Sequence, residues 1–255
     1  MPDTKPSMLV TIHQSYFMRG AALVLLLLFI YLAIFWGMKH LFEPKTTDYY
    51  VAFGIAIAGL IIAASMTSHL WVRFMAPTKP YLHLGKYQEA NATLQELASR
   101  AGFQVELRVI DAKRMFIYSA GVTNRLVLIS SKALESLSPT AMRGVLAHEV
   151  AHMVLTHAIK NACALASFFA LRICFQLSGP VALLMVMWLL LYLRSREYEA
   201  DKVAALMVGR EPVITALHEV KSITKMKEFS KLTEFMISTH PSYGRRELAL
   251  RATQF

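Results

Sequence analysis

The stretch LAHEVAH, residues 146–152, places two histidines four positions apart, with a glutamate directly after the first. In an α-helix, residues four apart differ by about 40° of rotation and one turn of rise, so His148 and His152 project from the same face. Glu149 points about 100° away from His148, beside the open coordination position. The stretch therefore predicts a helix that binds one metal ion and carries a carboxylate able to take a proton from water.

A pattern of five residues also arises by chance, so the prediction of a metal site needs a third ligand from elsewhere in the chain. His157 lies about 140° from His152 around a continuous helix and cannot reach the same ion. The downstream stretch SREYEAD, residues 195–201, is expected to be helical and places Glu197 and Asp201 on one face. Glu197 could complete a zinc site while Asp201 accepts a hydrogen bond from a ligand histidine. A plain charged helix end is the alternative interpretation of SREYEAD.

The segments around the histidine motif predict an α+β domain. Ser138 followed by Pro139 is typical of an N-cap and a first helical residue, so the histidines lie well inside a helix. A further helix is expected over residues 87–101, with Gly102 as its C-cap. Three strands are expected over residues 104–110, 115–121 and 125–130. We expect the strand at 125–130 to be the edge strand with which a substrate backbone would pair.

The composition places part of the chain in lipid. Hydrophobic residues make up 55% of the sequence and the mean hydropathy is +0.42, which is too apolar for an ordinary soluble domain of this length. Residues 20–38 and 49–72 contain no Asp, Glu, Lys or Arg and are each long enough to cross a bilayer. No A-x-A cleavage site follows the first run, which favours an uncleaved anchor over a signal peptide. We expect residues 1–80 to form this anchor with its linker and residues 81–255 to form the second domain.

A second apolar region, residues 162–193, predicts two antiparallel helical pieces that meet at Ser178-Gly179-Pro180. Each piece is short for a membrane crossing, and Arg172 would be costly against lipid. Two interpretations stay open: a shallow or re-entrant membrane hairpin, and helices buried against the rest of the protein. No helix breaker occurs before Gly209, so the second piece is expected to continue into SREYEAD.

The net charge of +10 comes without a zinc knuckle, a phosphate-binding loop or an aromatic and basic sheet pattern. We therefore expect a cationic face toward anionic lipid and no nucleic acid partner. Cys163 and Cys174 can build neither a disulfide framework nor a cysteine metal site. Lysines and arginines gather before the first span, after the second span and after residue 193, which places the N-terminus and the C-terminal two thirds in the cytoplasm.

Three motifs in order carry a family resemblance. HEVAH, then an apolar hairpin with SREYEAD, then STHPSYGRREL resembles the HtpX-like membrane zinc metallopeptidases, the family that also includes the CAAX prenyl protease. The likeness runs from about residue 86 to the C-terminus, and the two N-terminal spans also match the HtpX arrangement. It implies one Zn²⁺ per chain, bound by His148, His152 and Glu197.

The resemblance also implies the roles of the residues around the metal. Glu149 would be the general base, and Asp201 would hold a ligand histidine. His240 and Arg246 of the third motif would approach the site and stabilise the oxyanion, with Arg245 as a competitor for the second role. The family usually carries Asn-Ala-Phe where this chain has Arg114-Met115-Phe116, which puts the substrate-backbone contact there in doubt.

We therefore expect a mostly α membrane protein with two N-terminal transmembrane helices, followed by an α+β zincin-type metallopeptidase domain with a small edge sheet and an apolar hairpin. The expected function is a zinc endopeptidase of the bacterial inner membrane, with its catalytic domain in the cytoplasm, that cleaves membrane or misfolded proteins as quality control. Its partners would be a protein or peptide substrate and the lipid bilayer. The alternatives are a narrow processing protease for one partner and a catalytically silent metal-binding scaffold.

Overall fold

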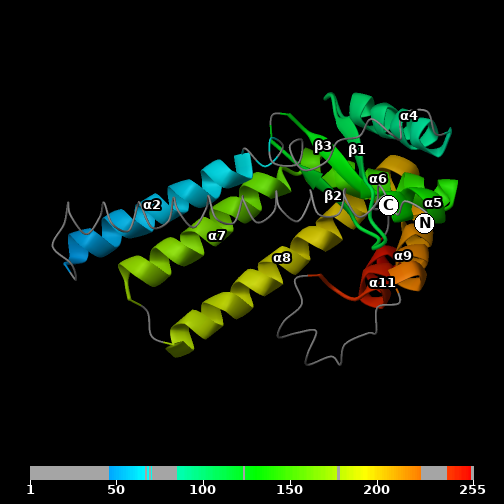
Figure 1. The fold of residues 1–255 in the computed structure, drawn as a ribbon. Helices are drawn as coiled ribbons and strands as arrows, with labels where there is room; N and C mark the ends of the chain where they lie inside the picture. The colour runs from blue at the N-terminus through cyan, green and yellow to red at the C-terminus, as the bar shows by residue number, and fades with distance from the viewer. Residues whose placement is uncertain are drawn as a thin grey trace, which may run out of the picture.

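The structure of the chain is a computed structural model, and it describes residues 46–66, 68, 70, 85–122, 124–176, 179–224 and 240–253. These residues are mostly helical and contain one three-stranded sheet. The helices α2 (Thr47–Met66), α7 (His157–Cys174) and α8 (Gly179–Val208) extend away from the sheet and the shorter helices (Figure 1). The expected membrane part and α+β part are thus both present. The expected span at 20–38 lies outside the described residues.

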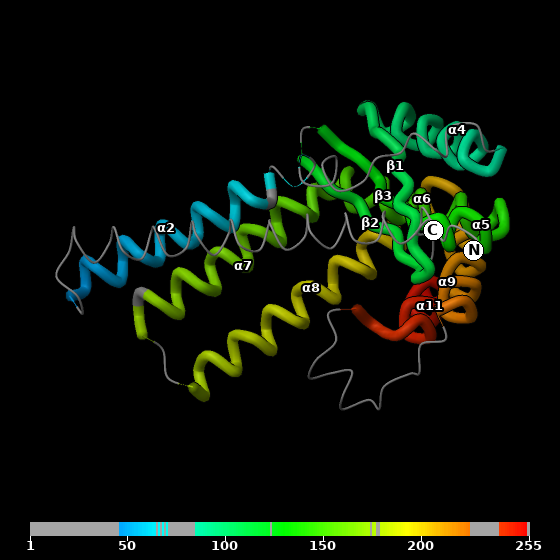
Figure 2. Tube along the Cα trace, viewed as in Figure 1, coloured from blue at the N-terminus to red at the C-terminus, as the bar shows by residue number. Residues whose placement is uncertain are grey.

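By length and composition, two of the described helices could cross a membrane, over Thr47–Ala64 and Gly179–Val208. Helix α7 packs along α2, and α8 runs without a break from the tip of the hairpin into the other part of the protein (Figure 2). The expected continuous helix into SREYEAD is confirmed. Gly209, in the left-handed region at φ 86°, ends α8.

The apolar hairpin is not buried against the rest of the protein. Leu184 and Trp188 on α8 are 65% and 60% exposed, and Phe169 on α7 is 39% exposed. The interpretation that these helices are buried against the rest of the protein is therefore wrong. The expectation that each piece is short for a membrane crossing is also wrong for the second piece, because α8 is long and apolar enough to cross. Arg172 lies in the last turn of α7 and is exposed there, next to the hairpin turn, where a long cationic side chain can reach the membrane surface.

The sheet has the order β1-β3-β2, with β1 at Glu106–Ile110, β2 at Ile117–Ala120 and β3 at Leu126–Ser130. Strand β3 is parallel to β1 and antiparallel to β2. The expected edge strand is therefore wrong, because β3 is paired on both sides. Every residue of β3 is buried, which explains its continuous apolar run. The edge strand beside the histidine helix is β2.

The core forms around α6 (Pro139–Val154), which contacts α8, α4 (Gly85–Arg100) and α9 (Arg210–Thr224). As expected, Ser138 is the N-cap of α6, and its hydroxyl accepts a hydrogen bond from the amide of Ala141. The expected helix before β1 is α4, and Gly102 follows it with φ 79°. Two short helices complete the described elements: α5 (Ser131–Ser136) and α11 (Tyr243–Ala252).

Helices α6 and α9 approach so closely at Gly144 that no side chain fits there. A Cβ atom on Gly144 would lie 2.1 Å from the carbonyl oxygen of Pro212 and 3.0 Å from the amide nitrogen of Val213. Gly144 stands one turn before His148, so this contact also sets the distance between the histidine helix and α9.

Candidate active site

Three potential metal ligands converge from two helices. His148 and His152 project from one face of α6, and their Nε2 atoms are 3.0 Å apart. Glu197 on α8 lies opposite them, with Oε2 3.6 Å from Nε2 of His148 and Oε1 3.6 Å from Nε2 of His152. A tetrahedral zinc ion with bonds of about 2.0–2.2 Å holds its ligand atoms about 3.3–3.5 Å apart. The donor set and its spacing fit zinc, as the sequence predicts.

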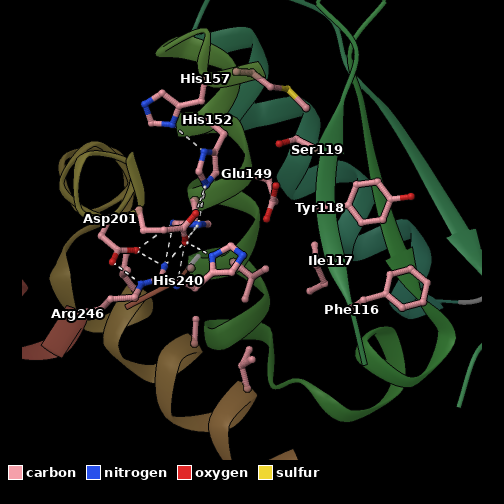
Figure 3. A pocket seen from close by; sticks show the side chains of 18 of the residues that line it. Phe116, Ile117, Tyr118, Ser119, Glu149, His152, His157, Asp201, His240 and Arg246 are labelled. Carbon is pink, nitrogen blue, oxygen red and sulfur yellow. Dashed lines mark hydrogen bonds and ion pairs between the residues drawn. The ribbon is translucent and has the colours of Figure 1, made fainter. Parts of the chain in front are cut away.

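Glu149 lies next to this cluster and is only 7% exposed (Figure 3). Its carboxyl group lies on the side of α6 that faces β2, close to Ser119. Burial raises the pKa of Glu149 above its usual value, and the neighbouring His148 and hydrogen bonds to Ser119 act in the opposite direction. A buried carboxyl group with a raised pKa beside a metal site is suited to proton transfer near neutral pH.

The outer nitrogen of His148 is held by an acid–arginine pair. Its Nδ1 atom is 3.0 Å from Asp201, the position that the sequence predicts for a residue supporting a ligand histidine. Arg246 donates to both Asp201 oxygens, at 2.6 and 2.7 Å, and its Nη1 lies 3.3 Å from Glu197. Arg246 is buried, whereas the neighbouring Arg245 is exposed. Of the two competing arginines, Arg246 faces the site.

His240 approaches the cluster from the segment before α11. Its Nδ1 atom lies 3.2 Å from Glu197, and its side chain is 68% exposed. The imidazole therefore contacts a metal-ligand candidate on one side and the open cavity on the other (Figure 3). All seven site residues that the sequence predicts are thus brought together by α6, α8 and the C-terminal segment.

The two ligand histidines have different electrostatic surroundings. Burial and the nearby His148 lower the pKa of His152 to about 3, which keeps its imidazole neutral. Burial and Arg246 also act to lower the pKa of His148, but Asp201 and Glu197 outweigh them and raise it to about 9. Without a metal, His148 therefore carries a proton at neutral pH, and this proton has to leave when a metal binds.

A cavity of about 610 Å³ opens over the cluster. The edge strand β2 and the preceding residues 115–116 line one side, and α9 and α11 line another (Figure 3). Apolar side chains form the wall beside His148: Val145, Val213, Leu217 and Tyr243. The sequence analysis missed this wall, because nothing in the sequence of α9 indicates that it lies beside α6.

His157 is not among the three potential ligands, as expected, yet it lies within the site. It is 1% exposed, and its Nδ1 atom is 2.8 Å from the Nδ1 atom of His152. Sequence reasoning also missed Ser119, whose position in a short strand gives no sign that it faces Glu149.

Comparisons with known proteins find a matching family and similar proteins. The model of the family described as "Peptidase family M48" matches residues 85–254. Among curated proteins, "Protease HtpX homolog" of Bacillus subtilis is 27% identical over 74% of this chain and 80% of its own length. "Protease HtpX" of Chromohalobacter salexigens is 26% identical over 64% of this chain and 71% of its own length.

A solved structure supports the fold. The crystal structure of S. mikatae Ste24p superimposes with a TM-score of 0.67 at 18% identity, covering 94% of this chain and 66% of that one. At this identity the likeness concerns the fold alone. The shared architecture extends over the peptidase part and the membrane helices described above.

Proposed function

The chain belongs to peptidase family M48 and is an integral-membrane metalloprotease, and on that premise we propose that it cleaves peptide bonds with one zinc ion bound by His148, His152 and Glu197. The observation that carries the proposal is the convergence of these three side chains beside the buried Glu149. A purely structural zinc site has no need for such a carboxylate. We further propose residues 1–80 as the membrane anchor and 81–255 as the peptidase domain.

Glu149 is the general base in this proposal. Zinc, when bound, lowers the pKa of a water molecule to about 7 and polarises the scissile carbonyl. Glu149 takes a proton from the attacking water and passes it to the leaving amine, and the raised pKa that burial gives it favours the first of these transfers.

His240 and Arg246 stabilise the developing oxyanion in different ways. The imidazole of His240 faces the cavity, and with both ring nitrogens protonated it donates one hydrogen bond to Glu197 and one to the oxyanion. The guanidinium of Arg246 is held by Asp201 and Glu197, so it contributes positive charge from behind the ligands and fixes their positions. Asp201 fixes the orientation of the His148 ring.

The substrate backbone pairs with the edge strand β2. Residues 116–119 line the cavity, and in the described part of the chain β2 pairs only with β3. A peptide added to the other edge of β2 would run past Glu149 and the metal ligands. Since backbone pairing requires no particular side chain, this mode suits unfolded substrates of many sequences, which favours a role in protein quality control.

We place the peptidase part in the cytoplasm and the membrane helices in the bacterial inner membrane. The start of α2, the end of α7 and the start of α8 lie at the same end, away from the sheet (Figure 1). Arg194, Arg196 and Lys202 lie on α8 toward the opposite end, which is the side that the positive-inside rule assigns to the cytoplasm. C-terminal fusions to green fluorescent protein and to alkaline phosphatase test this orientation, and an active phosphatase fusion would contradict it.

Cleavage of casein in mild detergent with zinc tests the function, with wild-type protein, Glu149→Gln and the matched surface variant Glu89→Gln. We expect a loss of about 10²–10⁴-fold in kcat for Glu149→Gln and none for Glu89→Gln. Equal cleavage by wild type and Glu149→Gln would refute the assignment of the base. Cleavage of only one protein in a panel of unrelated unfolded substrates would favour a narrow processing enzyme. Bound zinc without any cleavage would favour a scaffold.

A further inference from the structure

The helical conformation is interrupted between α6 and α7, directly after the helix that carries His148 and His152. Helix α6 ends at Val154, Thr156 adopts the left-handed conformation with φ 54°, and the axes of the two helices meet at 58°. In an uninterrupted helix His157 would point about 140° away from His152. The break turns it back instead, so that the two ring centres are 4.9 Å apart.

The contact between these rings has a defined direction. Nε2 of His152 faces the other ligand candidates, so a metal bound there requires that the ring proton of His152 sit on Nδ1. This Nδ1 donates across 2.8 Å to Nδ1 of His157, which must then be an acceptor. His157 consequently carries its own proton on Nε2.

The Nε2 atom of His157 points to a carboxylate. It lies 3.4 Å from Glu199 on α8, a long hydrogen bond in which the imidazole donates. Arg196 holds the same Glu199 oxygen at 2.7 Å and stacks on the ring of Tyr192 at 4.3 Å. The sequence of contacts from the metal position is thus imidazole, imidazole, carboxylate and guanidinium.

The Nδ1 atom of each ligand histidine is therefore held by a group that leads to a carboxylate on α8. Behind His148 the carboxylate of Asp201 is in direct contact and is paired with Arg246. Behind His152 the nearest carboxylate is too far for direct contact, and His157 fills the space between them. The two carboxylates, Glu199 and Asp201, both come from α8 and are two positions apart in the sequence.

We propose that His157 is a positioning residue of the metal site, which together with Glu199 fixes the tautomer and the ring orientation of His152 so that Nε2 is presented to zinc. The inference rests on the proposed zinc site. Groups that orient a metal-binding histidine in this way typically change metal affinity by about 10–100-fold when they are removed.

Zinc affinity, measured by competition with a chromogenic chelator on detergent-solubilised full-length protein, tests the proposal. His157→Phe keeps a ring of similar size but removes both nitrogens, and we expect it to weaken zinc binding by about 10–100-fold. The matched control is His218→Phe, since His218 is exposed and pairs with Glu247; its zinc affinity should equal that of the wild type. The thermal midpoint of each zinc-free variant shows whether it is folded.

Glu199→Ala is the second variant, because Glu199 is 45% exposed and its replacement leaves no cavity. We expect about 3–10-fold weaker zinc binding, a smaller loss because the contact with His157 remains. If His157→Phe folds and binds zinc as tightly as the wild type, the inference about His157 is wrong, while the proposed function stands. If His157→Phe does not fold, a zinc affinity of Glu199→Ala equal to that of the wild type has the same meaning. A wild-type protein that binds no zinc would remove the proposed function and this inference with it.

Discussion

Replacing Gly144 by alanine is expected to separate α6 from α9 and to disturb the metal site. The added Cβ would lie 2.1 Å from the carbonyl oxygen of Pro212 and 2.5 Å from its carbonyl carbon. Ordinary contacts of a Cβ atom begin at about 3.4 Å, so the two backbones would have to separate by about 1 Å. No flexible side chain is available to move aside, because the obstacle is the backbone.

The size of the effect follows from two opposing contributions. Forcing an extra carbon into a packed interface costs about 1–3 kcal/mol, and we take the upper end because backbone has to move. Alanine gains about 1 kcal/mol over glycine through its helix propensity. The net loss is about 2 kcal/mol, which lowers the thermal midpoint of a protein of this size by about 4–8 °C.

The matched control is Gly244→Ala, also in a helix, where an added Cβ meets nothing within 4 Å. Its thermal midpoint in detergent should equal or exceed that of the wild type. Because Gly144 precedes His148 by one turn, Gly144→Ala should also cleave casein more slowly. A Gly144→Ala protein with the thermal midpoint and activity of Gly244→Ala would refute the argument that this contact sets the position of α9.

Three further predictions concern the site. Asp201→Asn should lower zinc affinity by about 10–100-fold, measured by chelator competition, because it weakens the support of His148; a change of less than twofold would contradict the role of Asp201. Zinc binding at pH 7.5 should release at least about one proton, since the pKa of His148 is about 9 in the metal-free protein and the zinc-bound water supplies a further proton; calorimetry in two buffers of different ionisation enthalpy measures the number, and zero would contradict it. In chelator-treated protein, Glu149→Gln should raise the thermal midpoint at pH 7. The folded state raises the pKa of Glu149, so its ionised form is destabilising above the unfolded value of about 4.3 and the advantage should vanish at pH 3.5.

Much of the site could be predicted because its information is local. Two histidines four apart on a helix share a face whatever surrounds them, and the same holds for Glu197 and Asp201. The Ser138-Pro139 start and the Gly102 and Gly209 ends follow from backbone preferences of single residues. A continuous stretch without charge likewise predicts α2 as a membrane helix, whereas the sequence left the membrane or buried position of the first part of α8 open.

The strand order could not be predicted in the same way. An apolar run such as LVLIS reads as a strand, but it does not say whether one edge or both are paired. In the structure β3 lies between β1 and β2. Its Leu126 and Leu128 pack on one face, and its Val127 and Ile129 join the main core on the other. The edge at which we propose that a substrate pairs is therefore that of β2 and not that of β3.

The sequence by itself predicted which side chains would gather in the candidate site and which apolar stretches could lie in a membrane, since helical periodicity and hydropathy act over a few residues. Only the tertiary structure decided which arginine faces the site and that His157 contacts His152. Arg245 and Arg246 differ in orientation only once α11 packs against α8, and His157 reaches His152 only because the chain turns at Thr156. These contacts depend on the packing of elements distant in sequence, and such packing leaves no periodic signal along the chain.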